Sequence, residues 1–146
     1  MMVRDGVWLV PTLVAPRGVL DAIDRGDQVP ELVAEKARMV VDAHRDSFAR
    51  AVDAGVPIAM GTDTGVTPHG QNLRELGLMV AGGMSPTAVL QATTLSAARL
   101  MRLDDDLGTV EPGKLADLVV VDGDPLQLDG LKAGIRQVWR EGRRYL

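Results

Sequence analysis

The chain has 146 residues, of which 46% are apolar and 25% charged, and 16 Lys and Arg against 20 Asp and Glu give a net charge of −4. This length allows one domain with a hydrophobic core, and the acidic balance and 3% aromatic content argue against a nucleic-acid or anionic-membrane partner. The absence of cysteine excludes disulfides, thiolate-ligated zinc and a thiol nucleophile, and it fits a cytoplasmic protein.

Two apolar segments in the first half are predicted to be buried strands. Residues 7–13 are apolar at nearly every position, and Pro11 lies near the end, where a missing donor is tolerated. Residues 56–60 follow Gly55, which ends a helix predicted over about residues 30–54 from apolar spacing of three and four. A helix that leads directly into a strand is typical of a parallel α/β architecture.

Three further helices are predicted around these segments. A short one covers residues 17–24, and another covers residues 73–81 and stops at Gly82. The third opens at Ser85, with proline in its first position, and runs to about residue 101. Because apolar residues cover much of its circumference, this helix is expected to be buried on more than one side.

The last part of the chain is predicted to be a small β lobe. A strand is expected over residues 116–122, and residues 135–140 alternate between apolar and polar as a half-buried antiparallel strand does. Residues 141–142 then form a two-residue hairpin turn into residues 143–146. The sequence thus predicts a division into residues 1–103 and residues 104–146.

Asp63 is the first candidate functional residue. It follows the strand at residues 56–60 and the glycine at position 61, and a buried parallel strand delivers a reactive group to a pocket in this way. Two parallel strands with covering helices do not close a sheet, and the last strands would have bare edges. The sequence therefore has the character of part of a larger fold.

Residues 55–63, with Gly61-Thr62-Asp63, and Pro68-His69-Gly70 carry a resemblance to the amidohydrolase superfamily, in particular its imidazolonepropionase-like and prolidase-like branch. They are similar to the eighth barrel strand of that family and its following loop. Residues 85–100 resemble the next helix, residues 108–125 resemble the return of the chain into a small composite β-sandwich lobe, and residues 7–13 resemble strand seven. The resemblance covers essentially the whole chain.

The resemblance implies a TIM-type (β/α)8 hydrolase barrel with one or two divalent metal ions, most commonly zinc, at the mouth. Residues 1–103 would hold strands seven and eight with their helices, and residues 104–146 the last strands of the β lobe. Family members hydrolyse amide, peptide or cyclic amide bonds of small-molecule or dipeptide-like substrates by metal-activated water. By position, Asp63 would be the metal ligand and would accept the proton of that water.

The departure from the family pattern is equally informative. Family members take their other ligands from a His-x-His pair on strand one, a Lys or Glu on strand four, and histidines on strands five and six. This chain has only His44 and His69, and one carboxylate does not build a zinc site. We interpret it as the C-terminal portion of an amidohydrolase that lacks the N-terminal portion of its barrel and is inactive by itself. The alternative is a non-catalytic homo-oligomeric module in which Asp63 is a relic.

Each candidate also has a structural interpretation. Asp63 can be a turn residue that accepts backbone donors, flanked by Thr62 and Thr64, which are expected to hold the turn. His69 is either a solvated loop residue or a substrate contact, and His44 is expected to be a surface or helix-packing residue.

Other polar residues are assigned mainly to structural roles. Arg74 and Glu75 are expected to form a helix-face pair, although Asn72 and Arg74 are within reach of a substrate carboxylate. Residues 104–106 lack the spaced ligands of a calcium loop, so a solvated turn is expected there, and residues 111–114 are expected to form a structural turn.

Overall fold

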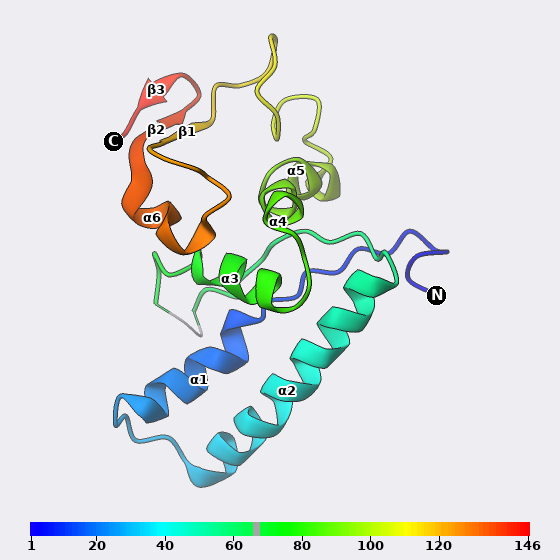
Figure 1. Ribbon diagram of the computed structural model, residues 1–146, viewed down its shortest axis with the longest axis vertical. Helices are drawn as coiled ribbons and strands as arrows, with labels where there is room; N and C mark the ends of the chain where they lie inside the picture. The colour runs from blue at the N-terminus through cyan, green and yellow to red at the C-terminus, as the bar shows by residue number, and fades with distance from the viewer. Residues whose placement is uncertain (66–67) are drawn as a thin grey trace. The chain divides into compact units, whose positions relative to one another are not determined.

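The computed structural model describes residues 1–65 and 68–146, which group into two units, Met1–Met84 and Ser85–Leu146 (Figure 1). The loop predicted after Gly65 includes residues 66 and 67, which lie outside the described residues. Helices and short strands are both present, as expected for an α/β chain. The domain boundary between residues 103 and 104 stays a prediction.

The two apolar segments of the first unit pair in parallel, but over a single bridge rather than along full strands. Leu9 lies opposite Ile58. The Leu9 N–H donates to the Pro57 carbonyl at 2.9 Å, and the Ala59 N–H donates to the Leu9 carbonyl at 3.1 Å. The expected strand lengths were wrong, and Pro11 and Pro57 give the reason, because each removes a backbone donor that a longer ladder needs.

Helices α1 (Val14–Asp24) and α2 (Glu31–Asp53) lie side by side and form the body of the first unit (Figure 1). The prediction for α2 is confirmed almost to the residue, whereas α1 begins three positions earlier than expected. The buried face of α2 carries Phe48, which is 1% exposed. This ring is the largest fully buried side chain in the described part of the chain.

Helix α3 (Arg74–Ala81) completes the first unit and ends at Gly82, as predicted. Its buried side includes Leu76 and Met79. A Cβ at Gly82 would lie 2.4 Å from Cδ1 of Phe48, so only glycine allows the chain to pass this close to the ring. The end of α3 therefore packs against Phe48 of α2.

The single helix predicted over residues 85–101 is wrong, because the structure has two helices, α4 (Pro86–Thr93) and α5 (Leu95–Met101). The break falls at Thr94, whose φ and ψ are −124° and −94°. The hydroxyls of Thr93 and Thr94 both donate to the Leu90 carbonyl, at 2.7 and 2.8 Å. Such side-chain bonds compete with the helical ladder and favour a break.

The start of α4 agrees with the prediction. The Ser85 hydroxyl accepts from the Ala88 N–H at 3.2 Å, and Pro86 occupies the first helical position. Proline is tolerated there because the first N–H groups of a helix have no partner within the helix.

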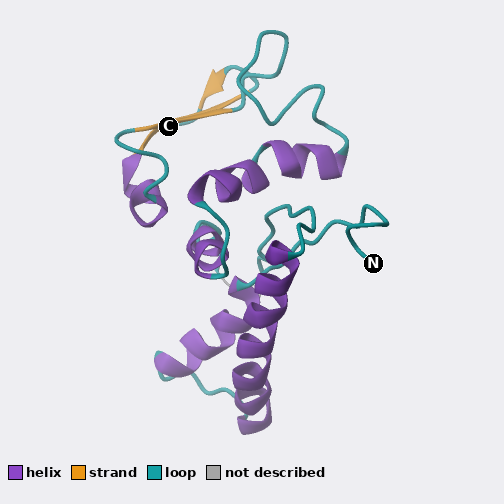
Figure 2. Cartoon of the chain, turned by 45° about the vertical axis from the view of Figure 1, so that its right-hand side comes forward, coloured by secondary structure: helices purple, strands orange, loops and turns teal. Residues whose placement is uncertain are grey.

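The second unit ends in a three-stranded antiparallel sheet in the order β1 (Leu118–Val121), β2 (Ile135–Arg140) and β3 (Arg143–Arg144), shown in Figure 2. The short helices η1 (Leu128–Gly130) and α6 (Leu131–Gly134) connect β1 to β2. The predicted turn at Glu141 and Gly142 is confirmed. Both residues have positive φ, 49° and 74°, which suits a tight hairpin.

The turn over residues 111–114 is structural, as expected. The ammonium group of Lys114 donates to the Asp104 carbonyl at 2.8 Å and lies 3.5 Å from the Glu111 carboxylate. The Lys114 side chain is only 13% exposed, and it links the turn over residues 111–114 to the turn over residues 104–106. Among the described residues, no helix combines the length and apolar character that a bilayer crossing requires.

Candidate functional site

The candidate site lies where the two parallel segments of the first unit end. A Cβ at Gly61 would lie 2.4 Å from Cγ1 of Val10 and 3.6 Å from Cγ2 of Thr12. The absence of a side chain at Gly61 thus lets the two segments approach each other just before Asp63. Thr12 and Asp63 both adopt left-handed backbone angles, with φ of 49° and 50°.

Asp63 is exposed at the end of its segment, between two threonines. The hydroxyls of Thr62 and Thr64 lie 2.6 Å apart and share a hydrogen bond, which supports the prediction that they hold the turn. In the part of the chain that the structure describes, no hydrogen bond or ion pair engages the Asp63 carboxylate. Its oxygens are therefore available to a ligand.

The left-handed conformation at Asp63 bears on its role. Aspartate and asparagine tolerate this region better than most residues, whereas it is an outlier for a β-branched residue such as Thr12. Non-glycine residues held in sparsely populated conformations cost about 1–3 kcal/mol each and cluster at functional sites. Two such residues at the ends of two adjacent parallel segments mark this corner as the site candidate.

We expect Gly61→Ala to destabilise the first unit by about 1 kcal/mol, because the new Cβ must displace a methyl group of Val10. Urea unfolding measures this, and Val10→Ala should remove most of the cost in a double-mutant cycle. Gly130→Ala is the control, since its Cβ meets nothing within 4 Å and its φ is −90°. Equal costs for Gly61→Ala with and without Val10 would contradict the close approach.

His69 is exposed in a turn of the loop that follows Asp63. No hydrogen bond or ion pair links the two within residues 1–65 and 68–146. His44 is half-buried on α2, in agreement with a packing role. Asp63 and His69 are thus six positions apart in the sequence, and the described residues show no hydrogen bond or ion pair between them.

The described residues do not complete a metal site. No group of three His, Asp or Glu side chains in residues 1–65 and 68–146 is arranged to hold a metal ion. Asp63 supplies one carboxylate, which suits a divalent cation, but structural and catalytic zinc sites use three or four protein ligands. A zinc ion at this corner would need further ligands from outside the described residues.

Glu75 has a role that the sequence did not reveal. It is fully buried, and its two carboxylate oxygens accept the N–H groups of Leu13 and Val14, both at 2.7 Å. Burial raises the pKa of the Glu75 carboxyl, and the two N–H donors oppose this shift. The predicted pair with Arg74 is wrong, because Arg74 instead binds Asp21 on α1.

A signal for Glu75 was present in the sequence. Glu75 and Met79 are four positions apart, so they share one face of α3, and that face is buried. A carboxylate on the apolar stripe of a short helix needs a polar partner inside the protein. The partners are the backbone N–H groups at the N-terminus of α1, and no residue type in the sequence identifies them.

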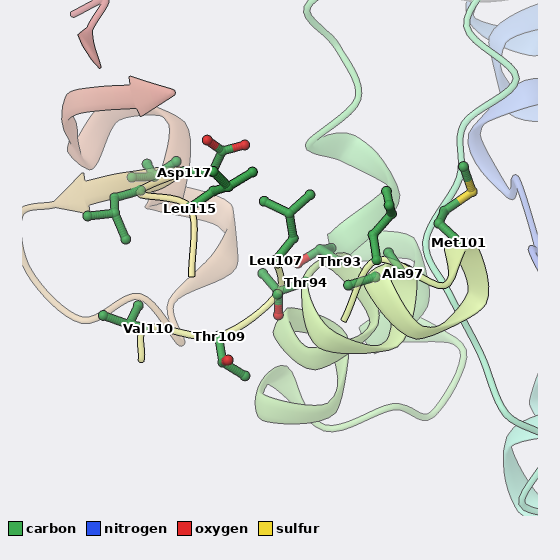
Figure 3. Close-up of a pocket in the computed structure, with 14 residues that line it drawn as sticks. Thr93, Thr94, Ala97, Met101, Leu107, Thr109, Val110, Leu115 and Asp117 are labelled. Atoms are coloured by element: carbon green, nitrogen blue, oxygen red, sulfur yellow. The ribbon is translucent and has the colours of Figure 1, made fainter. Parts of the chain in front are cut away.

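The second unit contains an apolar cavity of about 520 Å³. Figure 3 shows side chains of α4 and α5, among them Ala97 and Met101, on one side of it, and Leu115 and Asp117 on the other. Among the described residues that line it, Asp117 alone is ionisable, and this carboxylate accepts the Glu141 N–H at 2.7 Å. The lining therefore offers no pair of groups for acid–base or metal chemistry.

Comparison with known proteins gives a consistent result. The sequence model of the amidohydrolase family matches residues 1–144. The chain is 42% identical over 80 residues to the imidazolonepropionase of Aromatoleum aromaticum and 30% identical over 140 residues to the ochratoxinase of Aspergillus niger. These matches cover 53% and 90% of this chain.

A solved structure gives the same answer. The crystal structure of a Xaa-Pro dipeptidase with methionine bound in its active site superposes with a TM-score of 0.89, at 38% identity over 99% of this chain. The chain spans 36% of that dipeptidase, 28% of the ochratoxinase and 19% of the imidazolonepropionase. Since the family model matches nearly every residue and the fold agrees, the chain belongs to the amidohydrolase family.

Proposed function

We propose that this chain forms one wall of the active site of a metal-dependent hydrolase that cleaves a C–N bond in a small-molecule or dipeptide-like substrate. The observation that carries the proposal is the parallel pair at Leu9 and Ile58, with Asp63 exposed directly past its end. Parallel α/β enzymes place their reactive groups at this end of the strands. Membership of the amidohydrolase family supports the reaction class.

Residues 7–13 and 56–60 are then strands seven and eight of a (β/α)8 barrel, with residues 104–146 in the small β lobe. The exposed apolar side chains of Val7 and Val10, 48% and 42% accessible, support further strands beside this pair. Barrel strands are covered on both faces and paired on both edges. The single bridge is what remains of such a sheet when neighbouring strands are not beside it.

Asp63 is assigned two tasks, as a metal ligand and as the acceptor of a proton from the attacking water. Its carboxylate is exposed and engages no described partner, and the Thr62–Thr64 hydrogen bond holds the backbone around it. Asp63 would help to hold a divalent ion, most commonly zinc in this reaction class, which would supply a water that is nucleophilic at neutral pH. Asp63 holds the proton that the water loses and returns it to the leaving nitrogen.

His69 is assigned to the substrate. It is exposed and lies between Asp63 and the start of α3 in the sequence. A neutral or protonated imidazole in this position donates a hydrogen bond to a substrate carbonyl or carboxylate. The metal ligands that complete the site come from outside the described residues.

A non-catalytic module is the second candidate, and the exposed apolar strand β1 favours it. Val119 and Val120 are 56% and 43% accessible, and β1 pairs with β2 along one edge. Copies of this chain that bury such edges against one another would form a stable oligomer without any catalysis.

Activity and metal content of the purified 146-residue chain separate these functions. We expect the chain alone to show no hydrolysis of Xaa-Pro dipeptides and to bind no stoichiometric zinc. We expect hydrolysis and zinc binding to appear when the upstream reading frame is expressed with it. Metal-dependent hydrolysis by the chain alone would show that the site is complete. An upstream frame without His-x-His would instead favour the oligomeric module, with sedimentation velocity as the check.

A further inference from the structure

Glu75 is the buried charged residue of the described chain, with 0% of its surface exposed. A carboxylate in such a position is costly to bury unless each oxygen receives hydrogen bonds. Here each oxygen receives one: Oε1 accepts from the Leu13 N–H and Oε2 from the Val14 N–H. The pair of bonds holds the carboxylate in a fixed orientation.

The two donors belong to the N-terminus of α1, which has no cap of its own. Leu13 is the N-cap position and carries no polar side chain, and the first turn of this 11-residue helix contains no acidic residue. The first N–H groups of a helix favour a negative charge. Glu75 lies on α3, 61 positions after Val14 in the sequence, and from there it caps the N-terminus of α1.

This cap lies next to the candidate site. Leu13 directly follows Thr12, whose left-handed backbone angle turns the chain from the strand segment into α1. The methyl group of Thr12 faces Gly61, two residues before Asp63. Leu13 and Thr12 therefore connect Glu75 to the backbone that carries Asp63.

Helix α1 also contacts the start of α3, where the segment with His69 ends. The loop with His69 leads into α3 at Arg74. Arg74 binds Asp21 on α1 and donates to Gln71 at 3.2 Å. Adjacent residues of α3 therefore fasten this helix to the start and to the third turn of α1.

We propose that Glu75 is a positioning residue of the active site, which holds the end of the segment with Thr12 against Gly61 and so fixes where Asp63 stands. Its role in catalysis rests on the proposed function, but the positioning itself does not. Glu75 touches no substrate atom in this proposal, and it acts through Leu13 and Thr12.

Amide hydrogen exchange on the 146-residue chain tests the positioning without any activity. In Glu75→Gln, one acceptor oxygen becomes an amino group that faces an N–H donor, so we expect the Leu13 and Val14 amides to exchange at least tenfold faster. The Ala59 amide, which donates to Leu9, should change less than twofold. Glu35→Gln, the same substitution at an exposed position of α2, should change none of the three.

Unchanged exchange at Leu13 and Val14 would overturn the proposal. Equally faster exchange of the Ala59 amide would also overturn it, because Glu75 would then stabilise the whole first unit rather than position the segment with Thr12. In the hydrolase with its remaining metal ligands, we expect Glu75→Gln to lower kcat about tenfold or more, with KM and bound metal unchanged. If Glu75→Gln instead lost metal or raised KM alone, the link to catalysis would be overturned. If the wild-type enzyme were inactive but the exchange rates were as expected, only the proposed function would be refuted.

Discussion

Asp63→Asn is expected to lower kcat/KM of the complete hydrolase by about 10²–10⁴-fold, the usual contribution of a positioned acid–base group. Asparagine tolerates the left-handed angle that Asp63 adopts, so the backbone of the turn should keep its shape. The substitution removes the negative charge and the proton acceptor while leaving one oxygen for a metal. Steady-state kinetics and metal analysis of the purified variant measure the effect.

Asp105→Asn is the matched control for this prediction. Asp105 is exposed in the polar turn of the second unit, so its substitution should leave kcat/KM within twofold of the wild type. Equal kcat/KM values for the two variants would show that Asp63 is a turn residue. Asp63→Glu separates charge from placement, because it keeps the carboxylate but moves it by a methylene group.

Phe48→Ala is expected to reduce the free energy of unfolding of the first unit by about 3–5 kcal/mol. The ring is 1% exposed and packs against the end of α3 at Gly82, so its removal leaves a cavity where two helices meet. Trp8 lies in the first unit and Trp139 in the second. Urea unfolding followed by fluorescence in a Trp139→Phe background therefore reports on the first unit.

Two further variants make this result specific. Leu32→Ala removes a large apolar side chain from the same helix, but Leu32 is 64% exposed, so its cost should stay within about 0.5 kcal/mol. Gly82→Ala should be destabilising alone and much less so together with Phe48→Ala, because the ring that its Cβ meets is then absent. Additive costs would contradict the packing of α3 on Phe48.

Helices were the most predictable part of this fold, and α2 shows why. Its 23 residues repeat apolar positions every three to four, and proline and glycine mark its ends. The break between α4 and α5 was missed because neither proline nor glycine marks it. There the threonine hydroxyls at positions 93 and 94 compete for one carbonyl, which is a local choice that periodicity does not register.

The candidate site was only partly predictable. Asp63 could be selected because a carboxylate after an apolar strand-like segment and a glycine is informative by itself. Glu75 carried a signal as a carboxylate on the apolar face of α3, but its partners could not be identified, since they are backbone N–H groups more than 60 positions away in the sequence. Pro11 and Pro57 each remove a backbone donor from the two strands, but the strand lengths also depend on neighbouring strands that pair with them, which residues 7–13 and 56–60 do not specify.

The hydrogen bonds of Glu75 also determine the order in which this corner can form. They join residues separated by 61 and 62 positions, whereas α1 and α2 need only local contacts. Helices form in about a microsecond or less, while a long loop must lose its closure entropy before a distant contact contributes. We therefore expect the corner with Asp63 to form after the helices, and local unfolding that releases α3 to open the site while α1 and α2 are still helical.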